Sequence, residues 1–370
     1  MTRGREWKRT ALLGQAAILL LVIAVLAVGS FNAAANLKAG GIASGFGFLK
    51  VAAGFDIILH LIRYDEQSTY GAVFVVGLIN TLVLAMAAII IATVLGVIIG
   101  GARLSHNRLI AALAGAYIEL FRNVPALLQI FFWYFAVLRA LPGPRESLSA
   151  FGAVFLNSRG LYLPYPVPES SYEFIIIAGF TIALLIFTKR FLKNKVAAPV
   201  LVAVGLAALY LLPLEWHVPH FQRFGFTGGM VLIPEFVAML LGLSLFAAAY
   251  IAEVVRAGIE AVPRGQWEAA AALGLSQRRI FRRIILPQAR RVIVPPLGNQ
   301  YLDILKTSTL ATAIAYPDLM SVFGGTALNQ TGQAIEVLSI TLATYLLISL
   351  GITLLLGRYN ARSLRLTGRA

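Results

Sequence analysis

"AVFVVGLINTLVLAMAAIIIATVLGVIIGG", residues 72–101, carries no charged side chain. A transmembrane helix needs roughly 20 apolar residues to cross about 30 Å of hydrocarbon, so this stretch is long enough to span a bilayer. Comparable runs recur along the 370-residue chain, which is 59% hydrophobic and only 13% charged. Soluble domains carry about 25% charged residues. The composition therefore predicts an all-α polytopic membrane protein.

The apolar runs predict about eight transmembrane helices. We place them at 11–30, 72–101, 110–140, 174–188, 197–213, 230–254, 293–323 and 335–356. The third is interrupted by "FRNVPALLQ" (121–129), and "NQYLDILKTSTLAT" (299–312) places Asp303 and Lys306 in the seventh. Such interruptions survive at membrane depth only when they are buried against protein or line a wet cavity.

The N-terminal stretch resembles both a signal peptide and a first span. Basic residues precede the apolar run 11–30, and "NAAA" at 32–35 could serve as a cleavage site. The apolar core of nearly 20 residues exceeds the roughly 7–15 residues of a cleavable signal. We predict an uncleaved first span, with cleavage as the alternative.

The distribution of Lys and Arg predicts the orientation. With the N-terminus in the cytoplasm, 22 of the 31 basic residues fall in cytoplasmic segments and 7 in external ones. Cytoplasmic loops carry this excess in helical membrane proteins. Both termini and the loop 255–292 are therefore predicted inside. The net charge of +15 is explained by basic loops facing anionic lipid, so no nucleic-acid partner is expected.

The loop contains "EAAAALGLSQRRIFRRIILP", residues 268–287. Pro263 suits the first turn of a helix, and Gly274 suits the position just past its end. Ser276 is a good N-cap for a second helix that stops at Pro287. The second helix is amphipathic: one face holds Ile280, Phe281, Ile284 and Ile285, and the opposite face holds Arg278, Arg279, Arg282 and Arg283.

This segment resembles a cytoplasmic loop of the integral-membrane subunits of bacterial ABC importers. That loop has Glu-Ala-Ala, three residues, Gly, nine residues, Ile, one residue and Leu-Pro. The chain matches every gap, at Glu268, Ala269, Ala270, Gly274, Ile284, Leu286 and Pro287. A basic helix resting on lipid headgroups would explain the arginines but not the alanines and glycine. The flanks 116–135, 247–276 and 286–310 look like polar amino-acid permeases, and the added spans resemble their long, general L-amino-acid branch.

The resemblance implies the ABC type I importer permease fold and a transport subunit rather than an enzyme. It also implies a cytoplasmic ABC ATPase dimer that docks on 268–274, a second related permease or a second copy, and a periplasmic amino-acid-binding protein. The chain has no Gly-x-x-x-x-Gly-Lys-Ser/Thr motif, so ATP and Mg²⁺ are expected on the ATPase and no cofactor on this chain. The absence of Cys and the scattered four His predict no metal site.

The predicted organisation is a permease core with additions. Its parts are an N-terminal span and periplasmic segment (1–71), the first core part (72–140), an insertion (141–229) with irregular loops around a hairpin at 174–213, the second core part (230–357), and a basic cytoplasmic tail (358–370). The periplasmic segments 31–71, 141–173 and 214–229 are the expected docking surface for the binding protein.

Polar residues inside the spans are candidates for the translocation pathway, because an amino acid brings both an ammonium and a carboxylate. They are Asn80, Thr81, Glu119, Arg122, Gln129, Glu253, Arg256, Asn299, Asp303, Lys306, Thr307 and Ser308. Internal ion pairs, Glu253 with Arg256 and Asp303 with Lys306, are the alternative for four of them. An ion-coupled secondary carrier is the alternative function, but it leaves the loop at 268–287 unexplained.

Overall fold

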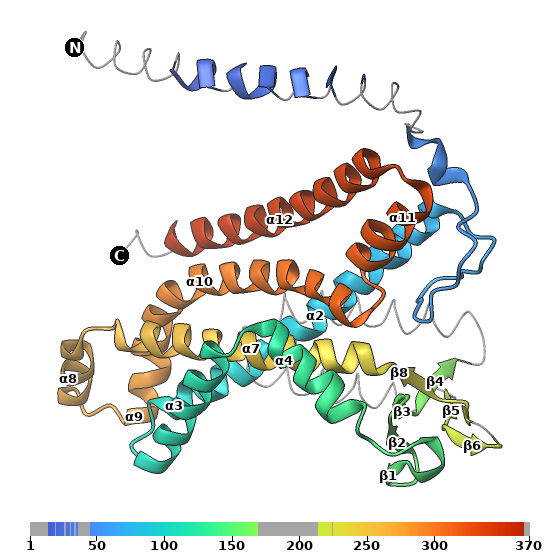
Figure 1. Ribbon diagram of the computed structural model, residues 1–370. Helices are drawn as coiled ribbons and strands as arrows, with labels where there is room; N and C mark the ends of the chain where they lie inside the picture. The colour runs from blue at the N-terminus through green and yellow to red at the C-terminus, as the bar shows by residue number, and fades with distance from the viewer. Residues whose placement is uncertain are drawn as a thin grey trace. The chain divides into compact units, whose positions relative to one another are not determined.

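A computed structural model describes residues 45–168, 214–223 and 225–365 and, before them, 14–18, 20–25, 27–29, 31–32 and 35. The described residues between 14 and 29 are helical, in the range of the first predicted span. The hairpin predicted at 174–213 lies outside the described residues. The chain divides into two compact units, Met1–Met86 with Ala257–Ala370, and Ala87–Arg256. Each is described by itself below, with the elements labelled in Figure 1.

Long apolar helices confirm the membrane assignment. In the described part α2 (Tyr70–Arg103), α7 (Pro234–Glu260) and the Ala334–Arg358 part of α12 (Ala334–Arg365) are long and apolar enough to cross a bilayer. A fourth span forms if the bent run from α3 (Arg108–Asn123) to α4 (Ala126–Phe131) and the π-helical η2 (Phe132–Leu138) counts as one. These elements correspond to the predicted spans at 72–101, 230–254, 335–356 and 110–140.

The break in the third predicted span has a local cause. Helix α3 begins where the Asn107 side chain accepts hydrogen bonds from the N–H groups of Leu109 and Ile110. It ends before Pro125, which favours an extended conformation in the preceding Val124. The two halves are bent by 102°. The amide of Gln129 donates to the carbonyls of Phe121 and Val124 at 2.9 and 2.8 Å, so it satisfies backbone groups that the break exposes.

The seventh predicted span is a helix over only part of its range. Helix α10 (Leu286–Thr307) begins seven residues before the predicted start at 293 and carries Arg290, Arg291, Asp303 and Lys306, so it is less apolar than the other long helices. It continues as the 3₁₀ helix η5 (Ser308–Ile314), which ends at Ala315, a residue with a left-handed φ of 59°. The π-helix η6 (Leu319–Ala327) and the short α11 (Leu328–Thr331) then lead to α12.

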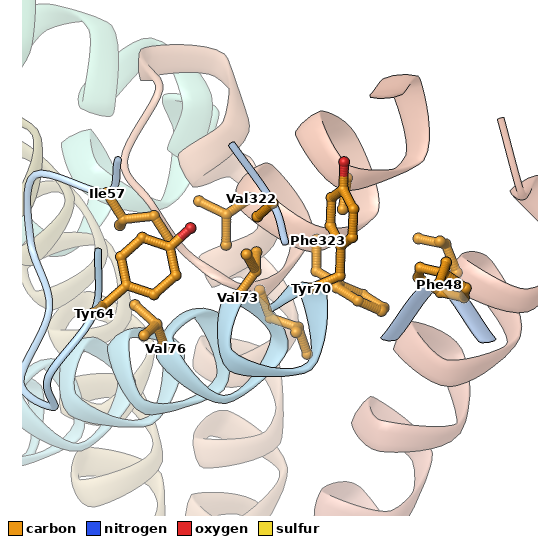
Figure 2. Packing of buried hydrophobic residues seen from close by; sticks show 12 residues of the cluster. Phe48, Ile57, Tyr64, Tyr70, Val73, Val76, Val322 and Phe323 are labelled. Atoms are coloured by element: carbon orange, nitrogen blue, oxygen red, sulfur yellow. The ribbon is translucent and has the colours of Figure 1, made fainter. Parts of the chain in front are cut away.

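In the first unit, α10 packs along α12 (Figure 1). A hydrophobic core joins the chain before α2 to the chain before α12. The 3₁₀ helix η1 (Phe46–Lys50) inserts Phe48, whose ring stacks on Phe323 of η6 with centroids 6.2 Å apart. Tyr64 and Tyr70 belong to the same cluster, and Figure 2 shows these side chains together with Val73 of α2 and Val322 of η6. The segment 45–69 is therefore packed into the core of the first unit rather than being a free loop.

In the second unit, α2 and α7 approach closely at two glycines one helical turn apart. A Cβ on Gly96 would lie 2.5 Å from Ile251, and one on Gly100 would lie 2.6 Å from the carbonyl oxygen of Ala252. Small residues at i and i+4 let membrane helices pack backbone to backbone. This contact fixes the C-terminal half of α2 against α7.

The second unit also contains short strands, which contradicts the prediction of irregular loops at 141–173 and 214–229. After the short η3 (Pro144–Glu146), β1 (Leu148–Ala150), β2 (Val154–Asn157), β3 (Gly160–Leu163) and β8 (Met230–Leu232) form one antiparallel sheet in that order. Two further pairs are β4 (Tyr165–Pro168) with β5 (Leu214–His217) and β6 (His220–Gln222) with β7 (Gly225–Thr227). The prolines of β4 are compatible with a two-stranded sheet, whose outer edges need no N–H donor. Because β8 occupies 230–232, α7 starts at Pro234 rather than at 230.

Candidate functional site

The loop at 261–287 forms the helix and glycine turn that its sequence predicts. Helix α8 (Arg264–Ala272) follows Pro263, and Gly274 takes a left-handed φ of 70° just past its end. The N–H of Gly274 donates to the carbonyl of Ala271 at 2.9 Å, and that of Leu275 to Ala270 at 3.3 Å. This pair of bonds is the Schellman motif, which favours glycine at the left-handed position. The glycine therefore sets the direction in which the chain leaves α8.

The arginine-rich half is amphipathic as predicted, but its helix does not stop at Pro287. After α9 (Gln277–Ile280) the π-helical η4 (Phe281–Ile285) leads directly into α10, with Pro287 in the first turn of α10. The wide π turn and the place of Pro287 in a first turn, where its missing N–H costs little, let the helix run on. Ser276 occupies the N-cap position, but its side chain makes no capping hydrogen bond.

The loop buries one face and displays the other. Ile280 and Ile285 are fully buried, while Arg278, Arg279, Arg282 and Arg283 are exposed. Ala270 is buried where α8 packs against α9 and η4. Glu268, Ala269 and Gly274 are exposed, and so is Leu273, with 80% of its surface accessible. Leu273 is not one of the site residues predicted from the sequence. An exposed leucine beside alanines and a glycine is an apolar surface suited to a protein partner.

Asn80, Thr81 and Ser308 are buried in the first unit, where their side chains hold backbone together. The Asn80 amide donates to the carbonyls of Leu59 and Pro317 at 2.8 and 2.9 Å. The Thr81 hydroxyl accepts from the N–H of Leu319 at 3.0 Å, and Ser308 donates to Leu305 at 2.7 Å. The bonds to Pro317 and Leu319 connect α2 to the start of η6, which gives Asn80 and Thr81 a structural role, whereas the bond of Ser308 is local.

The candidates on α10 differ, because most of them are exposed. Asn299, Asp303 and Lys306 lie at i, i+4 and i+7 and form one exposed polar stripe along the helix. Thr307 beside them is half-buried. Among the described residues the structure contains no ion pair between Asp303 and Lys306, so that alternative is not supported.

Among the candidates of the second unit, Arg122 and Arg256 lie near Glu253 of α7. Arg256 forms an ion pair with Glu253, in which its Nε lies 3.0 Å from Oε2, so this predicted pair is confirmed. The guanidinium of Arg122 lies over the ring of Tyr250, 5.2 Å from its centroid. Glu119 on the same helix as Arg122 is exposed. The first unit thus contains a buried polar set and an exposed polar stripe, and the second unit contains the ion pair of Glu253 with Arg256.

The sequence matches a known family. The family described as "Binding-protein-dependent transport system inner membrane component" matches residues 92–366. The chain belongs to this family. It is also 50% identical over 362 residues to the putative amino-acid ABC transporter permease protein YhdX of Escherichia coli (strain K12), covering 93% of this chain and 92% of that protein. The family's inner-membrane component is a transport subunit, in agreement with the long apolar helices.

Two further comparisons agree with the family. The General L-amino acid transport system permease protein AapQ of Rhizobium johnstonii is 44% identical over 346 residues, covering 90% of this chain and 86% of AapQ. The crystal structure of an amino acid ABC transporter with histidines superposes with a TM-score of 0.50 over 79% of this chain and 95% of that one. At 24% identity this similarity establishes the fold alone, and it confirms the expected type I importer permease fold.

Proposed function

We propose that this protein is the permease subunit of an ABC importer for L-amino acids and lies in the inner membrane with both termini in the cytoplasm. The observation that carries the proposal is the exposed α8–Gly274 turn at the family's spacing, in a chain whose relatives are amino-acid permeases by name. The excess of basic residues in 255–292 and at the two ends supports the orientation.

A separate cytoplasmic ATPase dimer would supply the energy. Its contact surface is proposed to be the exposed side of α8 with Glu268, Ala269, Leu273 and Gly274. The buried Ile280 and Ile285 anchor the arginine helix, and η4 runs without interruption into α10. A displacement of α8 by the ATPase would therefore be transmitted to α10. Nucleotide binding then shifts the population between inward-open and outward-open states, because it favours one of them.

The exposed stripe Asn299–Asp303–Lys306 supports a translocation path along α10. A polar stripe on a membrane helix is costly against lipid, so it requires a water-filled path or a partner subunit. A second related permease, or a second copy of this chain, is proposed to complete the path. The segments 31–71, 141–173 and 214–229 are proposed to receive a periplasmic amino-acid-binding protein.

Uptake in living cells tests this function. Cells that lack the gene should lose ATP-dependent uptake of one or more members of a labelled L-amino-acid panel, and the restored gene should return it. We expect a difference of about tenfold or more for the true substrates, because the path cannot form without its permease. Uptake that depends on an ion gradient and persists without ATP would instead identify a secondary carrier.

The hairpin proposed at 174–213 provides a second test. If it is an addition to the permease core, a chain with this segment replaced by a short Gly-Ser linker should still insert and still co-purify with the ATPase. The proposed coupling loop, residues 261–287, belongs to other helices. The unmodified chain, purified in parallel, gives the reference ratio of ATPase to permease. Loss of co-purification in the deleted chain, at equal membrane content, would show that the hairpin belongs to the core.

A further inference from the structure

A cavity in the first unit has the size and lining of a small-molecule site. It lies among the end of α10, η5, η6 and α12 and has a volume of about 630 Å³. Ligand pockets of proteins typically measure about 300–1,000 Å³. Six of its lining residues are polar: Lys306, Thr309, Thr312, Thr341, Tyr345 and Ser349. Leu342 and Leu346, which also line it, stay 69% and 59% exposed, so the cavity is open on the side of α12.

Lys306 is the charged member of this lining. No carboxylate of the described residues forms an ion pair with its ammonium. Its three N–H donors are therefore available to an anionic group, and a carboxylate is the anion that pairs most directly with them. The lining contains no Asp or Glu, so Lys306 would repel a second positive charge in the cavity. The buried Asp318 lies close to the hydroxyl of Tyr345 but does not line the cavity.

The hydroxyl groups of the cavity provide acceptors. Thr309 donates its proton to the carbonyl of Lys306 at 2.7 Å, and Thr341 donates to that of Val337 at 2.8 Å. Their oxygens keep lone pairs that can accept a hydrogen bond from an ammonium. The apolar part of the lining, which includes Met320, Leu342 and Leu346, can contact an aliphatic chain.

Tyr345 connects the cavity to the buried polar residues behind it. Its hydroxyl oxygen is buried and makes no hydrogen bond of normal geometry, although Thr81, Ser308 and Asp318 lie close to it. The Oδ2 atom of Asp318, a fully buried residue, likewise makes no hydrogen bond of normal geometry, and the carboxyl group of Asp318 lies close to the Tyr345 hydroxyl. Buried polar groups are normally partnered, and these neighbouring groups can satisfy one another without a ligand. Tyr345 lines the cavity with other atoms of its side chain, because its hydroxyl oxygen is buried among these polar groups.

We propose that this cavity binds an α-amino acid, with the carboxylate on Lys306, the ammonium on the hydroxyl oxygens, and the side chain against Met320, Leu342 and Leu346. The charge of the lining selects neutral and acidic amino acids over cationic ones. The inference rests on the proposed transport function and adds the location of the site and the class of substrate.

Direct binding to the purified permease–ATPase complex, without binding protein, tests the site. Labelled glutamine and glutamate are the probes, and labelled arginine is the cationic comparison. We expect Lys306→Met to raise the Kd for glutamine and glutamate about tenfold or more, since hydrogen bonds to charged groups contribute about 1.5–3 kcal/mol. Lys306→Arg should restore binding to within about threefold, because it keeps the charge. The unaltered complex should bind arginine at least about tenfold more weakly than glutamine.

Arg358→Met is the matched control, because it removes one exposed positive charge from the same unit at the far end of α12. It should leave the Kd unchanged, and all variants should keep the thermal unfolding temperature of the unaltered complex. Unchanged binding in Lys306→Met overturns the site, and equal binding of arginine and glutamine overturns the selectivity. If the unaltered complex imports amino acids with its binding protein but binds none alone, the site is wrong while the transport function stands. If it neither binds nor imports any amino acid, both proposals fail.

Discussion

Replacing Gly274 with tryptophan is expected to reduce ATP-driven uptake by about tenfold or more, while membrane insertion stays normal. The residue takes a φ of 70°, in the left-handed region that costs other residues about 1–2 kcal/mol. No other group lies within 4 Å of a Cβ placed there, so the indole would extend from the surface next to Leu273. It would thus obstruct the proposed docking of the ATPase. The effect is measured as uptake by proteoliposomes that contain the purified ATPase. Glu268→Lys should also reduce uptake.

Gly332→Trp is the matched control for this experiment. Gly332 is also exposed, has a φ of 67°, and has no group within 4 Å of a Cβ placed there. The two variants therefore carry the same bulk and the same backbone strain, but Gly332 lies between α11 and α12, outside the coupling loop. Gly332→Trp should co-purify with the ATPase as the unaltered chain does. Normal transport by Gly274→Trp would refute the docking surface.

The structure of the loop at 261–287 was predictable because its signals are local. A proline before a helix, a glycine after it and an N-cap residue act over a few residues, and each lies where the sequence places it. The exposure of Leu273 was not predictable, since it depends on which side of α8 packs against α9 and η4. The continuous passage from η4 into α10 was not predicted. A proline ends a helix when it lies in the helix interior, whereas Pro287 lies in the first turn of α10, where it is tolerated.

The polar residues of the spans show the opposite case. A polar residue in an apolar run either has a structural role or lines the translocation pathway, and the sequence does not distinguish these two roles. Asn80 is scaffold because the carbonyls of Leu59 and Pro317, 21 and 237 residues away in the chain, meet at its amide. Lys306 is exposed and lines a cavity, although it has the same polar character in the sequence. Asp318 and Tyr345 went unnoticed because only the fold brings them together.

The strands of the second unit were missed for a related reason. Each has only three or four residues, which is too short for an alternating pattern to stand out, and β8 pairs with β3 across a long insertion. Prolines in "YLPYPVPESS" argue for loops in a wide sheet, but they do not exclude a two-stranded one. The helical fold class is nevertheless correct, because the spanning helices dominate the chain.

Substituting leucine for Gly100 is expected to destabilise the protein by about 1–3 kcal/mol or more, the usual cost of overpacking a close-packed site. A Cβ at this position would lie 2.6 Å from the backbone oxygen of Ala252 and 2.9 Å from the Cβ of Val255. A backbone carbonyl cannot rotate away as the end of a side chain can, so α2 and α7 would have to separate. The change should lower both the thermal unfolding temperature in detergent and the yield of folded protein.

Gly101 provides the adjacent control. It is exposed, and no group lies within 4 Å of a Cβ placed on it. Gly101→Leu adds the same apolar side chain to the same helix, one residue further, and replaces glycine by a better helix former. It should therefore keep or slightly raise the unfolding temperature. If both variants unfold at the same temperature, the close approach of α2 and α7 at Gly96 and Gly100 does not stabilise the protein, and the helices of this unit are held together elsewhere.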